Sequence, residues 1–179
     1  MVTDTALRQV LDRVERVRPA EHRDLMSHFP TGVTIVTATG PDGSPRGLTC
    51  TSLSSVTLDP PTLLVCLNRR SGTLDALRNG RFGVNLLRLG AQQAAAVFSR
   101  PVADRFTGID WRPSPVLEVP HLVTDAFAFA GCVVRDSLVV GDHEIVLGEV
   151  CEIRNEPDEP LLYGMRTFSA LAPVAAAES

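Results

Sequence analysis

Residues 46–56, RGLTCTSLSSV, form the most informative stretch of this chain. The stretch begins as a β-rich run, continues into closely spaced Ser and Thr hydroxyls, and stops at the DPP of residues 59–61. Leu48, Leu53 and Val56 lie among the hydroxyls. This composition suits a half-buried segment that hydrogen-bonds the rim of a flat, polar-edged ligand while its apolar side chains anchor it. A Ser- and Thr-rich edge strand that binds no ligand is the alternative.

The patterns on both sides of this stretch indicate mostly β structure. Apolar and β-branched runs predict strands at residues 33–39, 46–51, 62–67, 82–86, 126–134, 138–140 and 143–153. Helices are predicted at residues 7–17, 21–28, 71–79 and 91–98, with Pro19 ending the first. Four prolines within residues 100–120 predict a long irregular connection. Because strands dominate, we expect a mainly β fold: an antiparallel Greek-key barrel with a few peripheral helices.

The length and composition predict one folded domain. A chain of 179 residues, 44% hydrophobic and 21% charged, can bury a single core. We expect an N-terminal helix at residues 1–19, the barrel domain at 20–170 and a loose tail at 171–179. A net charge of −4 with no long basic cluster argues against nucleic-acid binding. No apolar run approaches the roughly 20 residues that a membrane span needs.

The cysteines and histidines predict a protein without a metal site. Four widely spaced cysteines include no CxxC pair, which favours reduced, mostly buried thiols and a cytoplasmic location. The histidines share no metal-ligand spacing. No metal is therefore expected.

Four further motifs surround the first stretch. They are FPTGVTIVT at residues 29–37, LLVCLNRRSGT at 63–73, FGVNLL at 82–87 and GDHEIVLGEV at 141–150. In this order, the motifs resemble the short flavin reductase family across residues 20–170. The resemblance implies an FMN-binding split β-barrel that forms a homodimer. It also implies hydride transfer from NADH or NADPH to FMN or FAD, and supply of reduced flavin to a partner flavin-dependent monooxygenase.

The NRRSGT segment at residues 68–73 is the candidate for the phosphate end of the flavin. It precedes a predicted helix, whose first N–H groups are unpaired and carry a partial positive charge. Two hydroxyls and two guanidinium groups add to this anion seat. The resemblance assigns Asn68, Ser71 and Thr73 to the phosphate. A simple helix cap at Ser71 beside two solvated arginines is the alternative.

The remaining cofactor contacts come from several segments. The resemblance implies contacts by Thr31, Gly32, Thr49, Cys50, Thr51, Ser52, Ser54, Ser55, Leu67, Asn68, Ser71, Thr73, Asn85, Arg105, Phe106, Tyr163 and Phe168. Gly32 suits a close approach of the backbone to a ligand. Asn85 lies in an apolar strand, and its amide needs partners that either the flavin or the backbone supplies. A surface salt bridge beside Arg105 and a final edge strand at residues 162–168 are the alternatives for those segments.

His143 is the one candidate catalytic residue. It follows Gly141 and Asp142 at the start of a predicted strand. The resemblance places it beside the nicotinamide and the flavin, where its imidazole would donate a hydrogen bond. A structural histidine is the alternative. Hydride transfer between two cofactors requires no acid–base residue, which is consistent with the lack of a catalytic triad.

Three other functions remain compatible with these patterns. The first is a split-barrel flavoprotein that reduces another acceptor, such as a corrinoid or a metal chelate. The second is a non-catalytic flavin-binding or carrier protein, and the third is a β-barrel interaction module that binds no flavin. The strength of flavin binding separates them, since a reductase that releases its product binds weakly. The sequence does not choose between FMN and FAD, or between NADH and NADPH.

Overall fold

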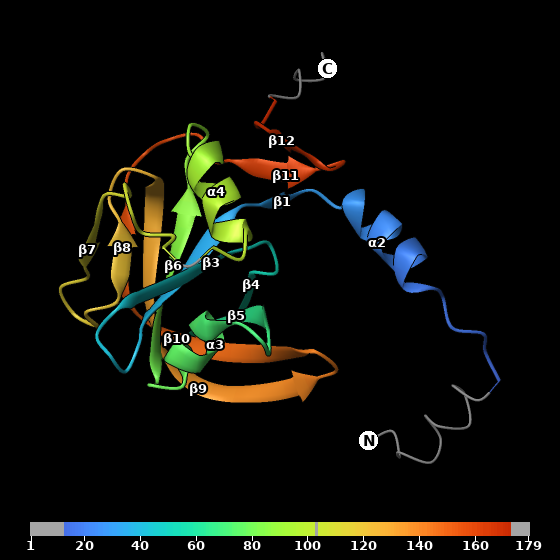
Figure 1. Cartoon of the computed structure of the whole chain (residues 1–179), viewed down its shortest axis with the longest axis horizontal. Helices are drawn as coiled ribbons and strands as arrows, with labels where there is room; N and C mark the ends of the chain where they lie inside the picture. The colour runs from blue at the N-terminus through green and yellow to red at the C-terminus, as the bar shows by residue number, and fades with distance from the viewer. Residues whose placement is uncertain (1–12, 103, 173–179) are drawn as a thin grey trace.

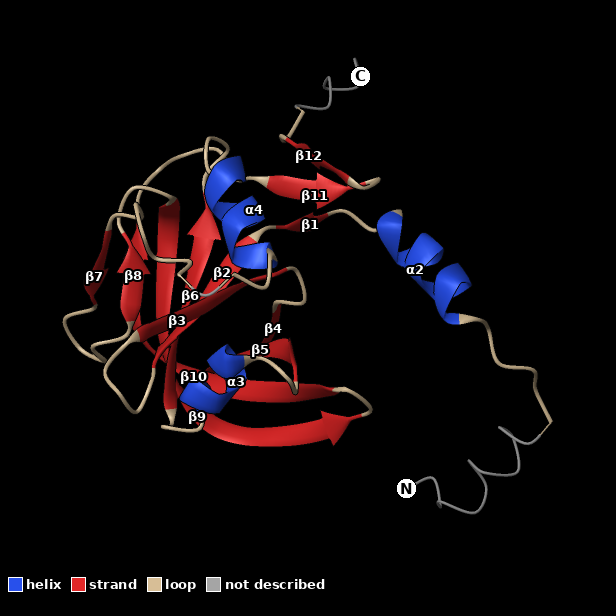
Figure 2. Cartoon of the chain, viewed as in Figure 1, coloured by secondary structure: helices blue, strands red, loops and turns tan. Residues whose placement is uncertain are grey.

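A computed structural model describes residues 13–102 and 104–172. Its centre is a strongly curled, seven-stranded antiparallel sheet with the order β3-β2-β6-β9-β10-β5-β4 (Figures 1 and 2). These strands are β2 (Thr34–Thr39), β3 (Pro45–Cys50), β4 (Ser54–Leu58), β5 (Pro61–Asn68), β6 (Arg81–Leu87), β9 (Ala126–Val140) and β10 (His143–Asn155). Strand β3 also contacts β5, so the sheet curls into a barrel. The expected mainly β, antiparallel split-barrel fold is confirmed.

Smaller elements surround the barrel. A three-stranded sheet has the order β1-β11-β12, and β7 pairs with β8. The remaining elements are α2 (Pro19–Ser27), β1 (Thr31–Gly32), α3 (Gly72–Leu77), α4 (Gln92–Ser99), β7 (Trp111–Pro113), β8 (Pro120–Leu122), β11 (Leu162–Gly164) and β12 (Thr167–Ser169). Figure 1 shows α2 projecting away from the barrel beside the turn between β11 and β12. No helix in the described part of the chain is long and apolar enough to cross a membrane.

Strand β2 is buried on both of its faces and divides the core into two clusters. Successive side chains of a strand point to opposite faces of the sheet. Val36 and Ala38 therefore join one cluster, which includes Phe82 inside the barrel. Val33 and Ile35 join a second cluster beneath α4. This packing fixes β2 and α4 beside one another.

The cysteines are free thiols. Cys50 and Cys132 are buried, Cys66 is half-buried and Cys151 is exposed. Burial raises the pKa of the Cys132 thiol to about 12, which keeps it protonated. The thiols are unpaired, as expected, but burial holds for Cys50 and Cys132 and not for Cys151.

Several expected boundaries are wrong. Residues 13–18 are not helical, and Pro19 begins α2 instead of ending a helix, because proline fits the first turn, where no N–H partner is needed. The rest of the expected N-terminal helix and most of the tail lie outside the described residues. Strand β9 is continuous, whereas the sequence predicts two strands. Residues 100–120 contain β7 and lead into β8, so this connection is not wholly irregular.

Candidate functional site

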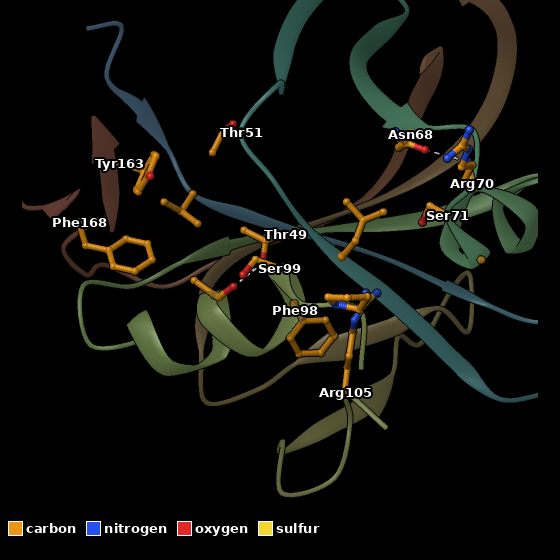
Figure 3. A pocket seen from close by; sticks show the side chains of 15 residues that line it. Thr49, Thr51, Asn68, Arg70, Ser71, Phe98, Ser99, Arg105, Tyr163 and Phe168 are labelled. Atoms are coloured by element: carbon orange, nitrogen blue, oxygen red, sulfur yellow. Dashed lines mark hydrogen bonds between the residues drawn. The ribbon is translucent and has the colours of Figure 1, made fainter. Parts of the chain in front are cut away.

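The main candidate site is a cavity of about 690 Å³ between β3, α4, the start of α3 and the β11–β12 hairpin. Figure 3 shows Asn68, Arg70 and Ser71 at one end and Tyr163 and Phe168 at the other. The side chains in this view come from Val33, Leu48, Thr49, Thr51, Asn68, Arg70, Ser71, Gly72, Ala95, Phe98, Ser99, Pro101, Arg105, Tyr163 and Phe168. The cavity therefore joins a polar, cationic end to an aromatic end.

The polar end is built where β5 passes into α3. Ser71 caps this helix, and its Oγ accepts a hydrogen bond from the Thr73 N–H at 3.2 Å. The Asn68 Oδ1 accepts a hydrogen bond from the Arg70 backbone N–H at 2.9 Å. None of the described lining residues is acidic, while Arg70 and Arg105 are cationic. This donor set favours an anion over a cation.

The floor of the cavity is held between β3 and α4. The Thr49 hydroxyl donates a hydrogen bond to the Ala95 carbonyl oxygen at 2.6 Å. Phe98 is buried and packs edge-on against Phe106, with ring centroids 5.0 Å apart. Phe106 in turn packs edge-on against Trp111, with ring centroids 5.6 Å apart. The aromatic contacts fix the segment after α4 as one wall of the cavity.

Arg105 fastens that wall to β3. Its Nη1 donates to the Gly47 carbonyl oxygen at 2.6 Å. Its Nε and Nη2 donate to the Arg100 carbonyl oxygen at 2.9 and 2.6 Å. Burial lowers the pKa of the Arg105 guanidinium from its ordinary value, but an arginine in a protein stays charged.

The aromatic end is formed by Tyr163 on β11 and Phe168 on β12. These residues face each other across the hairpin, and their ring centroids are 5.5 Å apart. Thr51 and Tyr163 also line a neighbouring cavity of about 810 Å³, together with Thr31, Gly32, Ser52 and Ser54. The predicted ring-contacting residues are thus divided between two adjoining cavities.

Ser52 has a structural role in shaping this region. Its Oγ donates to the Cys66 carbonyl oxygen and accepts from the Cys66 N–H, both at 3.0 Å. This single hydroxyl satisfies both backbone groups of one β5 residue. It thereby holds the segment between β3 and β4 against the barrel.

Seven of the predicted site residues line neither the main cavity nor the cavity of about 810 Å³ at the aromatic end. Cys50 and Leu67 are buried in the core inside the barrel. Ser55 lies on the exposed edge strand β4. Thr73 and Phe106 line an adjoining cavity of about 350 Å³, which shares Gly72, Pro101 and Arg105 with the main one. Asn85 and His143 are described next.

Asn85 forms a backbone bridge. It is fully buried, and its Nδ2 donates to the Ile35 carbonyl oxygen at 3.1 Å. Its Oδ1 accepts from the Leu122 N–H at 2.8 Å. The predicted flavin contact is therefore corrected: the amide joins β6, β2 and β8, because an amide buried at this position must satisfy both of its ends.

His143 lies opposite Asn68, which lines the polar end of the cavity. It pairs with Asn68 in the register between β10 and β5, and directly opposed residues of antiparallel strands place their side chains on the same face. The His143 Nδ1 is 2.8 Å from the Asp142 Oδ1. This hydrogen bond is the main cause that lowers the pKa of the Asp142 carboxyl. His143 thus neighbours the polar end of the cavity without lining it.

The structure also adds residues that the sequence-based set omits. Arg70, Gly72, Phe98, Ser99 and Pro101 all line the cavity. Arg70 belongs to the NRRSGT motif, but only the fold shows which of its two arginines faces the cavity. The other four residues lie at or next to the ends of α3 and α4. Whether they face the cavity depends on how these helices pack, and no local sequence pattern reveals that packing.

Known proteins with similar sequences and structures identify the family of this chain. The flavin reductase like domain model matches residues 26–172. A flavin reductase (NADPH) from Lentzea aerocolonigenes is 64% identical over 88% of this chain and 92% of its own. The reductase component of 4-nitrophenol 4-monooxygenase/4-nitrocatechol 2-monooxygenase from Rhodococcus opacus is 36% identical over 97% of this chain and 90% of its own.

A solved structure has a similar fold. The NADH:FAD oxidoreductase of Streptomyces globisporus, in complex with NAD and FAD fragments, has a TM-score of 0.81 and 33% identity. The match covers 91% of this chain and 100% of that chain. The motifs, the barrel and these similarities agree, and the chain belongs to the flavin reductase like domain family.

Proposed function

We propose that the protein is an NAD(P)H:flavin oxidoreductase that uses FMN or FAD as the hydride acceptor. The observation that carries this proposal is a single cavity with an aromatic end and a cationic end. A flavin nucleotide is likewise aromatic at one end and anionic at the other. The absence of carboxylates among the described lining residues, together with the apolar floor, fits this ligand.

The residues of this chain bind and orient the two cofactors. Tyr163 and Phe168 provide an apolar wall for the ring, and Thr51 offers a hydroxyl for its polar edge. Asn68 and Ser71 remain the proposed phosphate contacts. The bound flavin supplies the hydride-accepting chemistry. The protein contributes proximity and exclusion of water, and no side chain needs to move a proton.

We further propose that the reduced flavin serves a flavin-dependent monooxygenase. The Rhodococcus opacus relative, which is named the reductase component of a monooxygenase, supports this partner. The cytoplasm is the proposed location, because NAD(P)H is available there and the cysteines are free thiols.

Titration with FMN and FAD tests the proposal. Visible absorbance should report saturable binding of at least one flavin, and dialysis should remove it. Retention through dialysis would favour a carrier or a protein with a bound cofactor. A protein that perturbs neither flavin spectrum would contradict the proposed function.

His143→Ala should slow hydride transfer more than it weakens flavin binding. His143 lies opposite Asn68 in the strand register, and we propose that it orients the nicotinamide. One lost hydrogen bond is worth about 0.5–1.5 kcal/mol, or roughly two- to tenfold in rate. Stopped-flow reduction of pre-bound flavin measures this step directly. An unchanged reduction rate together with unchanged NAD(P)H affinity would assign His143 a structural role only.

The protein should sediment as a homodimer of the 19.3 kDa chain. Helix α2 has no buried residue, and Leu25 and Phe29 are 67% and 62% exposed. Apolar side chains gathered on a projecting element are typical of an interface. Sedimentation velocity at micromolar concentration checks this, and Phe29→Glu should increase the monomer fraction. A fully active wild-type monomer would contradict the dimer.

A further inference from the structure

The two arginines that line the cavity have opposite bonding states. Arg105 donates three of its five N–H groups to two backbone carbonyl oxygens, those of Gly47 and Arg100. The side chain of Arg70 makes no hydrogen bond or salt bridge with any residue in the described ranges, although its backbone N–H bonds Asn68. One guanidinium is fixed in place, whereas the other is available to a ligand.

Exchanging the backbone hydrogen bonds of Arg105 for bonds to a ligand phosphate would cost free energy. Gly47 lies on β3, an edge strand of the main sheet, where carbonyl groups lack a second strand to pair with. A half-buried guanidinium that turned toward a phosphate would leave the Gly47 and Arg100 carbonyl oxygens without this donor. The surroundings of Gly47 are also tightly packed, because a Cβ built on this residue would lie 2.7 Å from Phe98 Cε1 and 3.3 Å from Phe106 Cζ.

Arg70 has the opposite surroundings. It is exposed at the polar end of the cavity, beside Ser71 and Gly72. Figure 3 shows Arg70 grouped with Asn68 and Ser71, at a distance from the aromatic pair. Asp142 is near enough for Arg70 to contribute to its lowered pKa, but the carboxylate of Asp142 bonds His143. An unpaired guanidinium presents two parallel N–H groups, which match phosphate oxygens.

We propose that the two arginines have different roles. Arg70 binds the phosphate of the flavin nucleotide, and Arg105 is a positioning residue that fixes the cavity wall against β3. This inference rests on the proposed flavin reductase function. It replaces the expectation that Arg105 itself contacts the flavin or its phosphate. It also distinguishes Arg70 from Arg69, which is exposed but does not line the cavity.

Arg70→Ala tests the first role, with FMN and riboflavin as probes and no pyridine nucleotide present. The dissociation constant for FMN should rise about 10-fold or more, while that for riboflavin changes less than about twofold, because only FMN carries the phosphate. Added salt should weaken FMN binding to wild type more than to the variant. Arg69→Ala removes the same charge one residue away and is the matched control.

Three outcomes would overturn the assignment of Arg70. The first is an equal loss of FMN affinity in Arg69→Ala, which would indicate general electrostatic attraction by nearby positive charge and no direct bond from Arg70. The second is an equal loss of FMN and riboflavin affinity in Arg70→Ala. The third is unchanged FMN affinity with a raised KM for NADPH or NADH, which would place the pyridine nucleotide at Arg70. Wild type that binds neither flavin would contradict the proposed function itself, and this inference with it.

Arg105→Lys tests the second role, because lysine keeps the charge but cannot hold both carbonyl oxygens in the same geometry. FMN and riboflavin affinities should fall by a similar factor, about 3- to 10-fold. The spectrum of the bound flavin should shift, and hydride transfer at saturating cofactors should slow. A loss of stability alone would leave both of these readouts unchanged in the folded enzyme.

Phe106→Leu provides a second variant in case Arg105→Lys does not fold. It loosens the same wall by removing the edge-on contacts with Phe98 and Trp111, without any change of charge. The same spectral shift and slower transfer are expected. The positioning role is overturned if Arg105→Lys retains FMN affinity that Arg105→Ala loses, or if Phe106→Leu leaves the spectrum and rate of bound flavin unchanged.

Discussion

Asn85→Ala should lower the free energy of unfolding by about 3 kcal/mol, because it leaves buried backbone groups without partners. The Asn85 Nδ2 donates to the Ile35 carbonyl oxygen and to the Thr37 Oγ1, at 3.1 and 3.2 Å. Its Oδ1 accepts from the Leu122 N–H at 2.8 Å. Alanine can satisfy none of these groups, and a position with 0% exposure offers no ready access to water. Urea denaturation measures the loss.

Asn79→Ala is the matched control for this variant. Asn79 is exposed, and its Nδ2 donates a single hydrogen bond to the Thr39 carbonyl oxygen at 3.0 Å. Water can replace that bond, so the change should stay below about 1 kcal/mol. FMN affinity of the folded Asn85→Ala protein should match wild type. Unchanged stability with weakened FMN binding would show that Asn85 contacts the flavin after all.

Gly148→Ala should destabilise the barrel by about 3 kcal/mol, at the upper end of typical overpacking costs. A Cβ at residue 148 would overlap Phe82 Cζ, and it would lie 2.6 Å from Phe82 Cε1 and 3.0 Å from Cys132 Cβ. Phe82 and Cys132 are completely buried and cannot move aside without disturbing the core. The thermal midpoint of unfolding reports the effect.

Gly90→Ala is the control for the glycine substitution. Nothing lies within 4 Å of a Cβ built on Gly90. The thermal midpoint of that variant should therefore stay close to that of wild type. A Gly148→Ala protein as stable as wild type would show that the contact between β10 and Phe82 is looser than described.

The sequence predicts the barrel because most of its strands are buried on at least one face. Largely apolar runs of strand length, such as residues 62–67 and 82–86, favour buried strands, and both are strands. Strand β4 carries no such signal, because all five of its residues are exposed on a sheet edge. Its serines resemble a ligand-binding loop in the local sequence, and of the two, Ser54 lines the cavity of about 810 Å³ at the aromatic end.

The site is less predictable than the fold, because its residues owe their roles to distant partners. Thr49, Thr51, Asn68 and Ser71 carry a local signal and do line the cavity. The role of Asn85 depends on Leu122, which lies 37 residues further along the chain. The bonds of Arg105 likewise depend on Gly47, which is 58 residues away. No local pattern reveals which arginine is already bonded to the protein and which remains available.

Anaerobic single-turnover mixing of the protein with flavin and NADH or NADPH tests the central claim most directly. With at least one pairing of FMN or FAD with NADH or NADPH, one equivalent of flavin should be reduced for each equivalent of pyridine nucleotide oxidised, because hydride transfer moves two electrons. The rate should far exceed that of the same cofactors without protein. No protein-dependent flavin reduction with any of the four pairings would contradict the account.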